Sequence, residues 1–157
     1  INVMKLSTFS SFQTPDTLIE PTFSEVNVVD HSETVEMRTL DTVMEELGAE
    51  CPAGKTYLKM DTQGFDMEVI RGAEKCLDRI IALQTEATVR ALYKDVPNFV
   101  KSYEILAAKG FDTTGMFPLS WDRSQRVIEF DFDTARNINR AIGYTGHCKY
   151  SKTQNSD

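Results

Sequence analysis

The sequence predicts an α/β fold in which a parallel sheet is closed at one side by an antiparallel hairpin. Four stretches of the 157-residue chain indicate this fold. In YLKMDTQGFDMEVIRGAEKCL (57–77) a buried strand turns on a glycine and continues with helix spacing. An amphipathic helix follows at 96–107, and two strand-like runs follow at 111–121 and 125–133.

The first part of the chain is predicted to be loop-rich. Residues 1–34 mix Ser, Thr and Pro, which is typical of a surface segment. VEMRTL (35–40) alternates apolar and polar residues and is predicted to be a short strand. A helix should follow, with Thr39 or Asp41 as its cap and Gly48 as its stop.

The central part predicts two buried strands that flank a helix. TYLKMD (56–61) is entered through the turn-forming PAG at 52–54, and a helix should begin near Asp66. RIIALQTEA (79–87) is almost continuously apolar at its start, as expected for a strand that is covered on both faces.

The third predicted helix, at 96–107, has the clearest pattern in the chain. Pro97 lies near its start and Gly110 lies just past its end, as helix termini prefer. Its apolar residues recur at helical spacing: Val96, Phe99, Val100, Tyr103, Leu106 and Ala107. The two strands after it should pair antiparallel around a turn at 122–124. We therefore assign residues 35–150 to one folded unit and residues 151–157 to a polar tail.

Composition limits the classes of function. No apolar run approaches the length of a membrane span, and a net charge of −7 disfavours binding to nucleic acid or to anionic membrane. A small molecule or a protein is the expected partner. The three cysteines are widely spaced and form no CxxC pair, so we expect a reduced, cytoplasmic compartment and no metal site.

A candidate site lies where the two parallel strands end. Ligands of open α/β sheets bind outside the carboxyl ends of the strands, where Asp61 and Glu86 are expected to be neighbours. Gly64 would let the backbone turn sharply after Asp61. The alternative is structural, because Asp61 would also suit a helix cap and Asp66 a helix dipole. Lys59 would then extend to solvent or pair with a neighbouring acid.

Other side chains that often carry chemistry are given structural roles. His31 and His147 fall in loop-like or tail-like segments and are expected at the surface. Trp121, Phe130 and Phe132 are expected in core and turn packing rather than in a platform for nucleic-acid bases, because the chain is acidic.

Four blocks of the sequence resemble successive blocks of the FkbM-type methyltransferases. They span roughly residues 35–137 and read TLDTVMEEL, YLKMDTQGFDMEVIRGAEKCL, ALQTEATVRALYKDVPNFVKSYEILAAKGF and RVIEFDFDTARN. STFSSF near the start also resembles the serine-containing segment of that family. The block with Lys-x-Asp, Gly, an acid two residues later and Arg-Gly-Ala is the most specific of them.

The resemblance implies a class I methyltransferase that uses S-adenosylmethionine on a Rossmann-like seven-stranded sheet and methylates a hydroxyl of a sugar or natural product. Asp61 matches the acid at the end of the fourth strand, which faces cofactor and acceptor, and Glu86 matches the acid at the end of the fifth strand. Thr62, Gln63 and Gly64 match the loop after the fourth strand. The resemblance thus implies catalytic roles for Asp61 and Glu86, and cofactor contacts for Asp61 and this loop.

The chain departs from the family in one respect. It has no glycine-rich strand-to-helix turn and no ribose-binding acid one strand later. We therefore expect it to match the C-terminal half of the family's domain and to bind S-adenosylmethionine weakly by itself. The alternative function is a structural or interaction module without catalysis.

The same departure predicts an open sheet edge. Without the strands that precede it in the family, strand 56–61 would have one unpaired side, which favours a homo-oligomer joined across that edge. Residues 1–30 folded back as a substitute strand are the alternative.

Overall fold

The computed structural model describes residues 1–16, 21–50 and 56–136. Its elements in chain order are β1 (Asn2–Met4), β2 (Val29–Ser32), α1 (Leu40–Leu47), β3 (Thr56–Lys59), α2 (Asp66–Arg71), β4 (Ile80–Thr88), α3 (Phe99–Ala108), β5 (Phe111–Trp121) and β6 (Val127–Arg136). Short 3-10 turns occur at Ser7–Phe9, Pro21–Phe23, Gly48–Glu50 and Leu77–Arg79. The predicted polar tail, His147, Cys51 and Cys148 lie outside the described residues.

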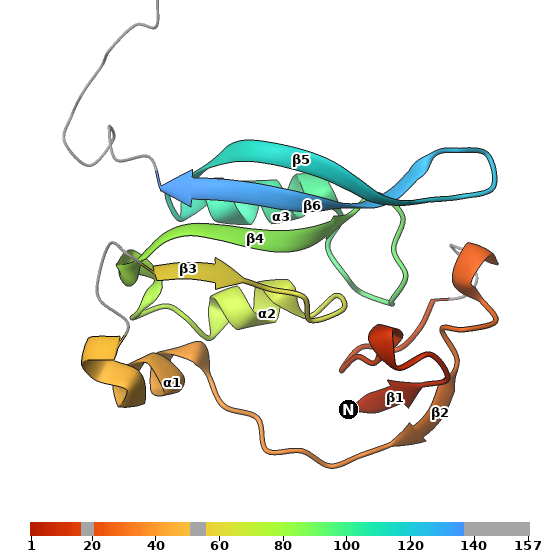
Figure 1. Ribbon diagram of the computed structural model, residues 1–157, viewed down its shortest axis with the longest axis horizontal. Helices are drawn as coiled ribbons and strands as arrows, with labels where there is room; N and C mark the ends of the chain where they lie inside the picture. Colours follow the sequence, from red (N-terminus) through yellow and green to blue (C-terminus); the bar gives the residue numbers. More distant parts are fainter. Residues whose placement is uncertain (17–20, 51–55, 137–157) are drawn as a thin grey trace, which may run out of the picture.

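The main sheet has four strands in the order β3-β4-β6-β5 (Figure 1). β3 and β4 are parallel, whereas β6 pairs antiparallel with both β4 and β5. The predicted α/β sheet, parallel first and closed by an antiparallel hairpin, is confirmed for these strands.

One face of this sheet carries the core, and α2 and α3 pack on it (Figure 1). β6 alternates strictly: Ile128, Phe130, Phe132 and Thr134 are buried. The residues between them, Glu129, Asp131 and Asp133, project to the other face, where β4 places Gln84 and Glu86 as their neighbours. Acidic side chains therefore share the face that these two helices do not cover.

The helices start and end close to where the sequence places them. Thr39 caps α1 through its hydroxyl, which accepts the Thr42 N–H at 3.2 Å, and Gly48 ends the helix. The Asn98 side chain caps α3 by accepting the Lys101 N–H at 3.0 Å. α3 therefore begins at Phe99 rather than at 96, because Asn98 supplies the cap.

The strand predicted at 35–40 is wrong. The backbone from Glu33 to Thr39 is irregular and exposed, and Leu40 already belongs to α1. Alternation predicts a strand only where one face can be buried against a neighbour, and no described strand pairs with this segment.

The N-terminal segment is more ordered than its composition suggests. β1 and β2 pair antiparallel in a small separate sheet and do not replace a partner of β3. A second apolar cluster joins Met4 to Leu92, Tyr93 and Ile128. Residues 1–16 therefore dock onto the loop that follows β4.

The aromatic and cysteine side chains follow the predictions in part. Phe130 and Phe132 are buried in the core as predicted. Trp121 is 46% exposed and ends β5 beside the hairpin turn, so it does not belong to the core. Cys76 is a buried free thiol. No helix in the described part of the chain is long and apolar enough to cross a membrane.

β3 forms one edge of the described sheet. We propose that two copies of the chain pair across this edge in a two-fold arrangement, as an unprotected edge strand favours. Sedimentation at micromolar concentration should then give a dimer. Tyr57→Lys adds a positive charge to β3 of each copy, so the two edges should repel and give a monomer, whereas Ile81→Lys on the neighbouring β4 should leave the dimer intact. A monomeric wild type would contradict the proposal.

Candidate functional site at the ends of β3 and β4

The strand-to-helix corner, residues 60–66 between β3 and α2, is organised by one buried carboxylate, that of Asp66. Asp66 is 3% exposed at the first position of α2. Its Oδ1 accepts the Thr62 N–H at 3.0 Å and also the Thr62 hydroxyl. Its Oδ2 accepts the Thr85 hydroxyl at 2.5 Å and the Glu86 N–H at 3.0 Å. Asp66 therefore ties the β3 corner to β4, a larger role than the predicted favourable charge at a helix N-terminus.

This tie brings Asp61 and Glu86 together. Lys59 pairs with Gln84, and the Met60 N–H still donates to Gln84 O at 2.8 Å, so the parallel register leads Asp61 toward Glu86. β4 continues to Thr88, so Glu86 lies inside the strand rather than at its end as predicted. The predicted proximity of the two carboxyl groups is nevertheless confirmed through the residue that bridges them.

The bridging residue is Gln63. Its Nε2 donates to Asp61 Oδ1 at 3.2 Å and to Glu86 Oε2 at 2.9 Å. Its Oε1 accepts the Tyr93 hydroxyl at 2.9 Å. One amide therefore contacts both carboxyl groups and a buried phenol.

The N-terminal segment supports the bridge from the other side. The Ser11 hydroxyl donates to Gln63 O at 2.6 Å, and the Tyr93 hydroxyl also lies 2.8 Å from Phe9 O. Phe12 and Phe65 pack with ring centroids 5.1 Å apart. The corner is therefore formed by three separate segments of the chain.

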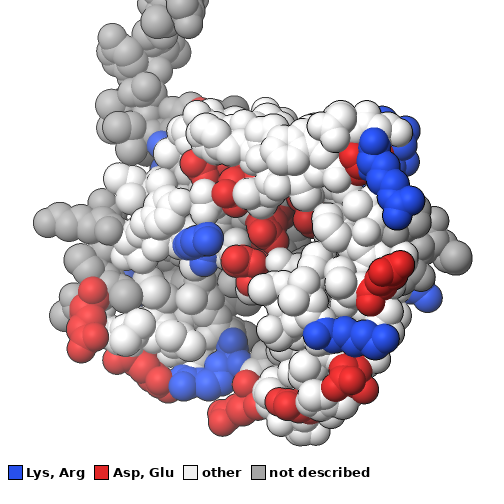
Figure 2. Space-filling model, turned by 45° about the vertical axis from the view of Figure 1, so that its right-hand side comes forward, with Lys and Arg blue, Asp and Glu red and all other residues white. Residues whose placement is uncertain are grey.

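The acidic groups of the corner perturb one another's pKa values. Burial raises the pKa of Glu86 to about 8, and the charges of Asp61, Glu129, Asp66 and Asp131 act in the same direction. Burial and the charges of Asp66 and Asp61 raise the pKa of Glu129 to about 7. Figure 2 shows acidic side chains gathered near the middle of its face, with basic side chains mostly at the margins. The cluster therefore holds protons close to neutral pH.

The purely structural roles considered for Asp61 and Lys59, a helix cap and an ion pair, can be compared with their contacts. Asp61 does not cap α2, whose N-cap is Phe65 without a side-chain cap bond. Lys59 pairs with Asp61 at 3.9 Å, and both side chains are more than half exposed, so this pair contributes little stability. Asp61 is thus left with a solvent-accessible carboxylate beside a half-buried carboxyl group.

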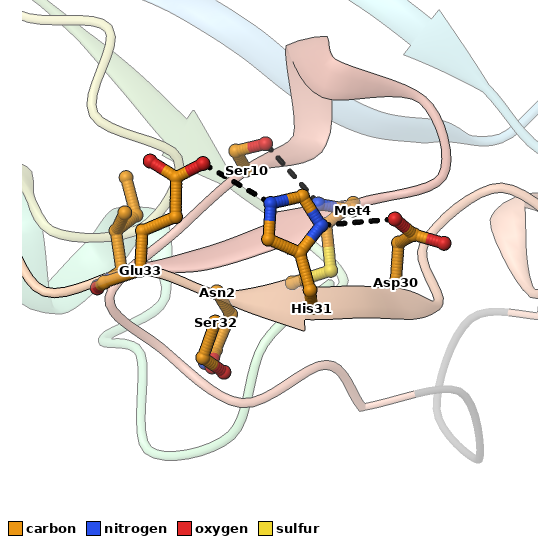
Figure 3. Close-up of polar contacts among 8 residues, drawn as sticks. Asn2, Met4, Ser10, Asp30, His31, Ser32 and Glu33 are labelled. Atoms are coloured by element: carbon orange, nitrogen blue, oxygen red, sulfur yellow. Dashed lines mark hydrogen bonds and ion pairs between the residues drawn. The ribbon is translucent and has the colours of Figure 1, made fainter.

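The described histidine, His31, forms its polar contacts with its chain neighbours rather than with Asp61 or Glu86. His31 lies exposed on β2, as predicted for a surface residue, with Nδ1 2.9 Å from Asp30 and Nε2 3.1 Å from Glu33 (Figure 3). These carboxylates raise its pKa. Within residues 1–16, 21–50 and 56–136, no group of three His, Cys, Asp or Glu side chains is placed to hold a metal ion.

Sequence reasoning missed three participants. Ser11 and Glu129 lie 52 and 43 positions from Gln63 and Glu86; they belong to STFSSF and RVIEFDFDTARN, but neither stretch was predicted to reach this site. Tyr93 appears only within the block ALQTEATVRALYKDVPNFVKSYEILAAKGF of the resemblance. The strict alternation of VIEFDFD carried a usable signal, because acids at every second position of a strand must share one face.

Gly64 is required by the packing of the corner. Its φ is +84°, and a Cβ there would lie 2.9 Å from Val96 Cγ2 and 3.1 Å from Tyr93 Cδ2. Gly64→Ala should lower the free energy of unfolding by about 2–4 kcal/mol through backbone strain plus overpacking. Gly48→Ala is the matched control, since φ is +51° there with nothing within 4 Å of the added Cβ. Denaturant unfolding that gives equal losses for both would contradict this reading.

The pKa of Glu86 predicts a pH-dependent stability. Because its folded pKa of about 8 exceeds the usual 4.5, the folded state keeps a proton that the unfolded state has released between these values. The free energy of unfolding should therefore fall as pH rises from about 5 to about 8, by about 2 kcal/mol after allowing for solvent screening.

Glu86→Gln should make this fall smaller and leave the part due to Glu129, whose pKa is also raised, whereas Glu104→Gln on the exposed face of α3 should not change it. Chemical denaturation at a series of pH values measures both. A wild-type profile that rises across this interval would contradict the assignment.

Comparison with known proteins agrees with the family that the motifs resemble. The family model described as the methyltransferase FkbM domain matches residues 2–113, which is more than half of the chain and extends the resemblance to the N-terminal segment. Searches of curated proteins and of solved structures found no match. The chain belongs to the FkbM methyltransferase family.

Proposed function

We propose that this chain acts in an O-methyltransferase that uses S-adenosylmethionine and methylates a hydroxyl of a sugar or natural product. The observation that carries the proposal is the pair formed by Asp61 and Glu86. The Gln63 amide bridges the two carboxyl groups, and the second oxygen of Asp61 remains accessible to solvent. Transfer of a methyl group to a hydroxyl oxygen releases a proton, and a carboxylate in contact with that hydroxyl is a suitable acceptor.

The residues of the corner do not by themselves form a cradle for S-adenosylmethionine. The Thr62 hydroxyl is bonded to Asp66, and the Gln63 amide is bonded to three side chains. Gly64 faces Tyr93 and Val96 rather than open space. The Thr62 N–H and the Gln63 carbonyl are also engaged, by Asp66 and Ser11, so cofactor contacts of Thr62, Gln63 and Gly64 stay a prediction.

Asp61 offers one carboxylate oxygen to the hydroxyl of a methyl acceptor. Asp61 Oδ1 is held by Gln63, while Oδ2 is 3.9 Å from Lys59, too far for a hydrogen bond. An acceptor hydroxyl would donate to Oδ2 and pass its proton to this carboxylate. Glu86, with a pKa of about 8, would be neutral at pH 7 and would limit the repulsion on Asp61. A groove of about 580 Å³ has Thr62 and Phe65 in its wall, but Asp61, Gln63 and Glu86 do not line it, so it carries no part of this proposal.

The test is Asp61→Asn in the protein that carries these residues. The amide keeps the shape and the contact with Gln63 but cannot take the proton, so methyl transfer should fall by roughly 10²–10⁴. Transfer of labelled methyl from S-adenosylmethionine to a panel of hydroxylated acceptors measures it.

Asp78→Asn is the matched control, because Asp78 is 95% exposed and precedes the start of β4, where it pairs with Arg136 rather than with Asp61 or Glu86. Unchanged unfolding of Asp61→Asn would show that the loss is not structural. Full turnover by Asp61→Asn would contradict the proposal and favour a non-catalytic module.

A further inference from the structure

We propose that Tyr93 and Ser11 are positioning residues: together they fix Gln63 so that its amide nitrogen stays directed at both Asp61 and Glu86. The catalytic meaning of this arrangement rests on the function proposed above. The arrangement itself is a property of the folded chain and can be tested without a substrate.

The first requirement is that the backbone of Gln63 be held. Gln63 has a φ of 49°, in the left-handed region that residues other than glycine rarely adopt. The carbonyl of this same residue accepts the Ser11 hydroxyl at 2.6 Å. Ser11 is 1% exposed and is fixed in turn by two backbone hydrogen bonds with Asn2, at 2.8 and 3.0 Å. The N-terminal segment thus holds an otherwise unfavourable conformation in place.

The second requirement is that the amide point in one direction. Tyr93 is 2% exposed, and its single hydroxyl proton is shared between Gln63 Oε1 at 2.9 Å and Phe9 O at 2.8 Å. Burial and the nearby carboxylates raise the pKa of Tyr93, so this hydroxyl remains a donor. A donor placed at Oε1 directs the Nε2 group to the opposite side, where its two N–H bonds meet two carboxyl groups.

The negative charges around Glu86 raise its pKa, and the Gln63 amide opposes them. Asp61 after β3, Asp66 on α2, and Glu129 and Asp131 on β6 all raise the pKa of Glu86. The one cation near them in the described corner, Lys59, pairs with Asp61. The Gln63 N–H is the side-chain donor that favours the ionised form of Glu86. Releasing it should therefore leave Glu86 harder to ionise.

The experiment follows the side-chain carboxyl carbon of Glu86 by ¹³C NMR from pH 5 to 10, with the resonance assigned by Glu86→Gln. Several N–H bonds to one carboxylate lower its pKa by about two units, so the loss of one should raise it by about one unit. We expect that rise in Tyr93→Phe and a rise in Ser11→Ala.

Two conservative variants are the matched controls. Tyr103→Phe removes a half-exposed hydroxyl on α3, and Ser10→Ala removes a hydroxyl that accepts the Met4 N–H. Both should leave the midpoint of Glu86 unchanged. An unchanged or lower midpoint in folded Tyr93→Phe and Ser11→Ala would overturn the inference.

A second route covers the case in which Tyr93→Phe or Ser11→Ala does not fold. Gln63→Ala removes the amide outright and should give the largest rise, and the absence of any rise there would also overturn the inference. Because the titration needs no substrate, a chain that transfers no methyl group could still confirm the positioning. If methyl transfer is measured, its dependence on pH should move upward in Tyr93→Phe with little change in KM, which a purely structural loss would not produce.

Discussion

The corner depends on one buried carboxylate. Asp66 accepts hydrogen bonds from the backbone and side chain of Thr62, from Thr85 and from the backbone of Glu86, so it joins the end of β3, the body of β4 and the start of α2. A buried charge is tolerated only when its oxygens are satisfied, and four donors meet that condition. The distance between neighbouring strands then places Asp61 and Glu86 within reach of one amide.

The chemistry of the corner follows from this proximity. Carboxyl groups that are partly buried and close to one another hold protons at a higher pH than exposed ones, and Glu86 and Glu129 show this effect. Groups that titrate near neutral pH suit proton transfer, which matches the chemistry expected of a methyltransferase acting on a hydroxyl. Ser11, Phe9 and Tyr93 add support from outside the sheet. Membership of the FkbM family shows a methyltransferase domain, and the accessible carboxylate of Asp61 is the group on which the proposed transfer to a hydroxyl depends.

Local patterns in the sequence predict most of the described fold, because helix caps, apolar spacing and turn residues act over a few positions. The strand at 35–40 was wrong because alternation does not show whether a neighbouring strand exists. Asp61 and Glu86 could be predicted as neighbours from a general rule for parallel strands. The bonds from Ser11 and Tyr93 to Gln63 could not, since they depend on how the N-terminal segment and the loop after β4 dock in three dimensions.

The most direct test of this account is the side-chain amide of Gln63 observed by ¹⁵N NMR between pH 5 and 9. If Nε2 bridges Asp61 and Glu86, its N–H protons should exchange slowly with water, and their chemical shifts should move with a midpoint near the Glu86 pKa of about 8. An amide that exchanges as fast as an exposed glutamine, with shifts that do not change across this interval, would contradict the account.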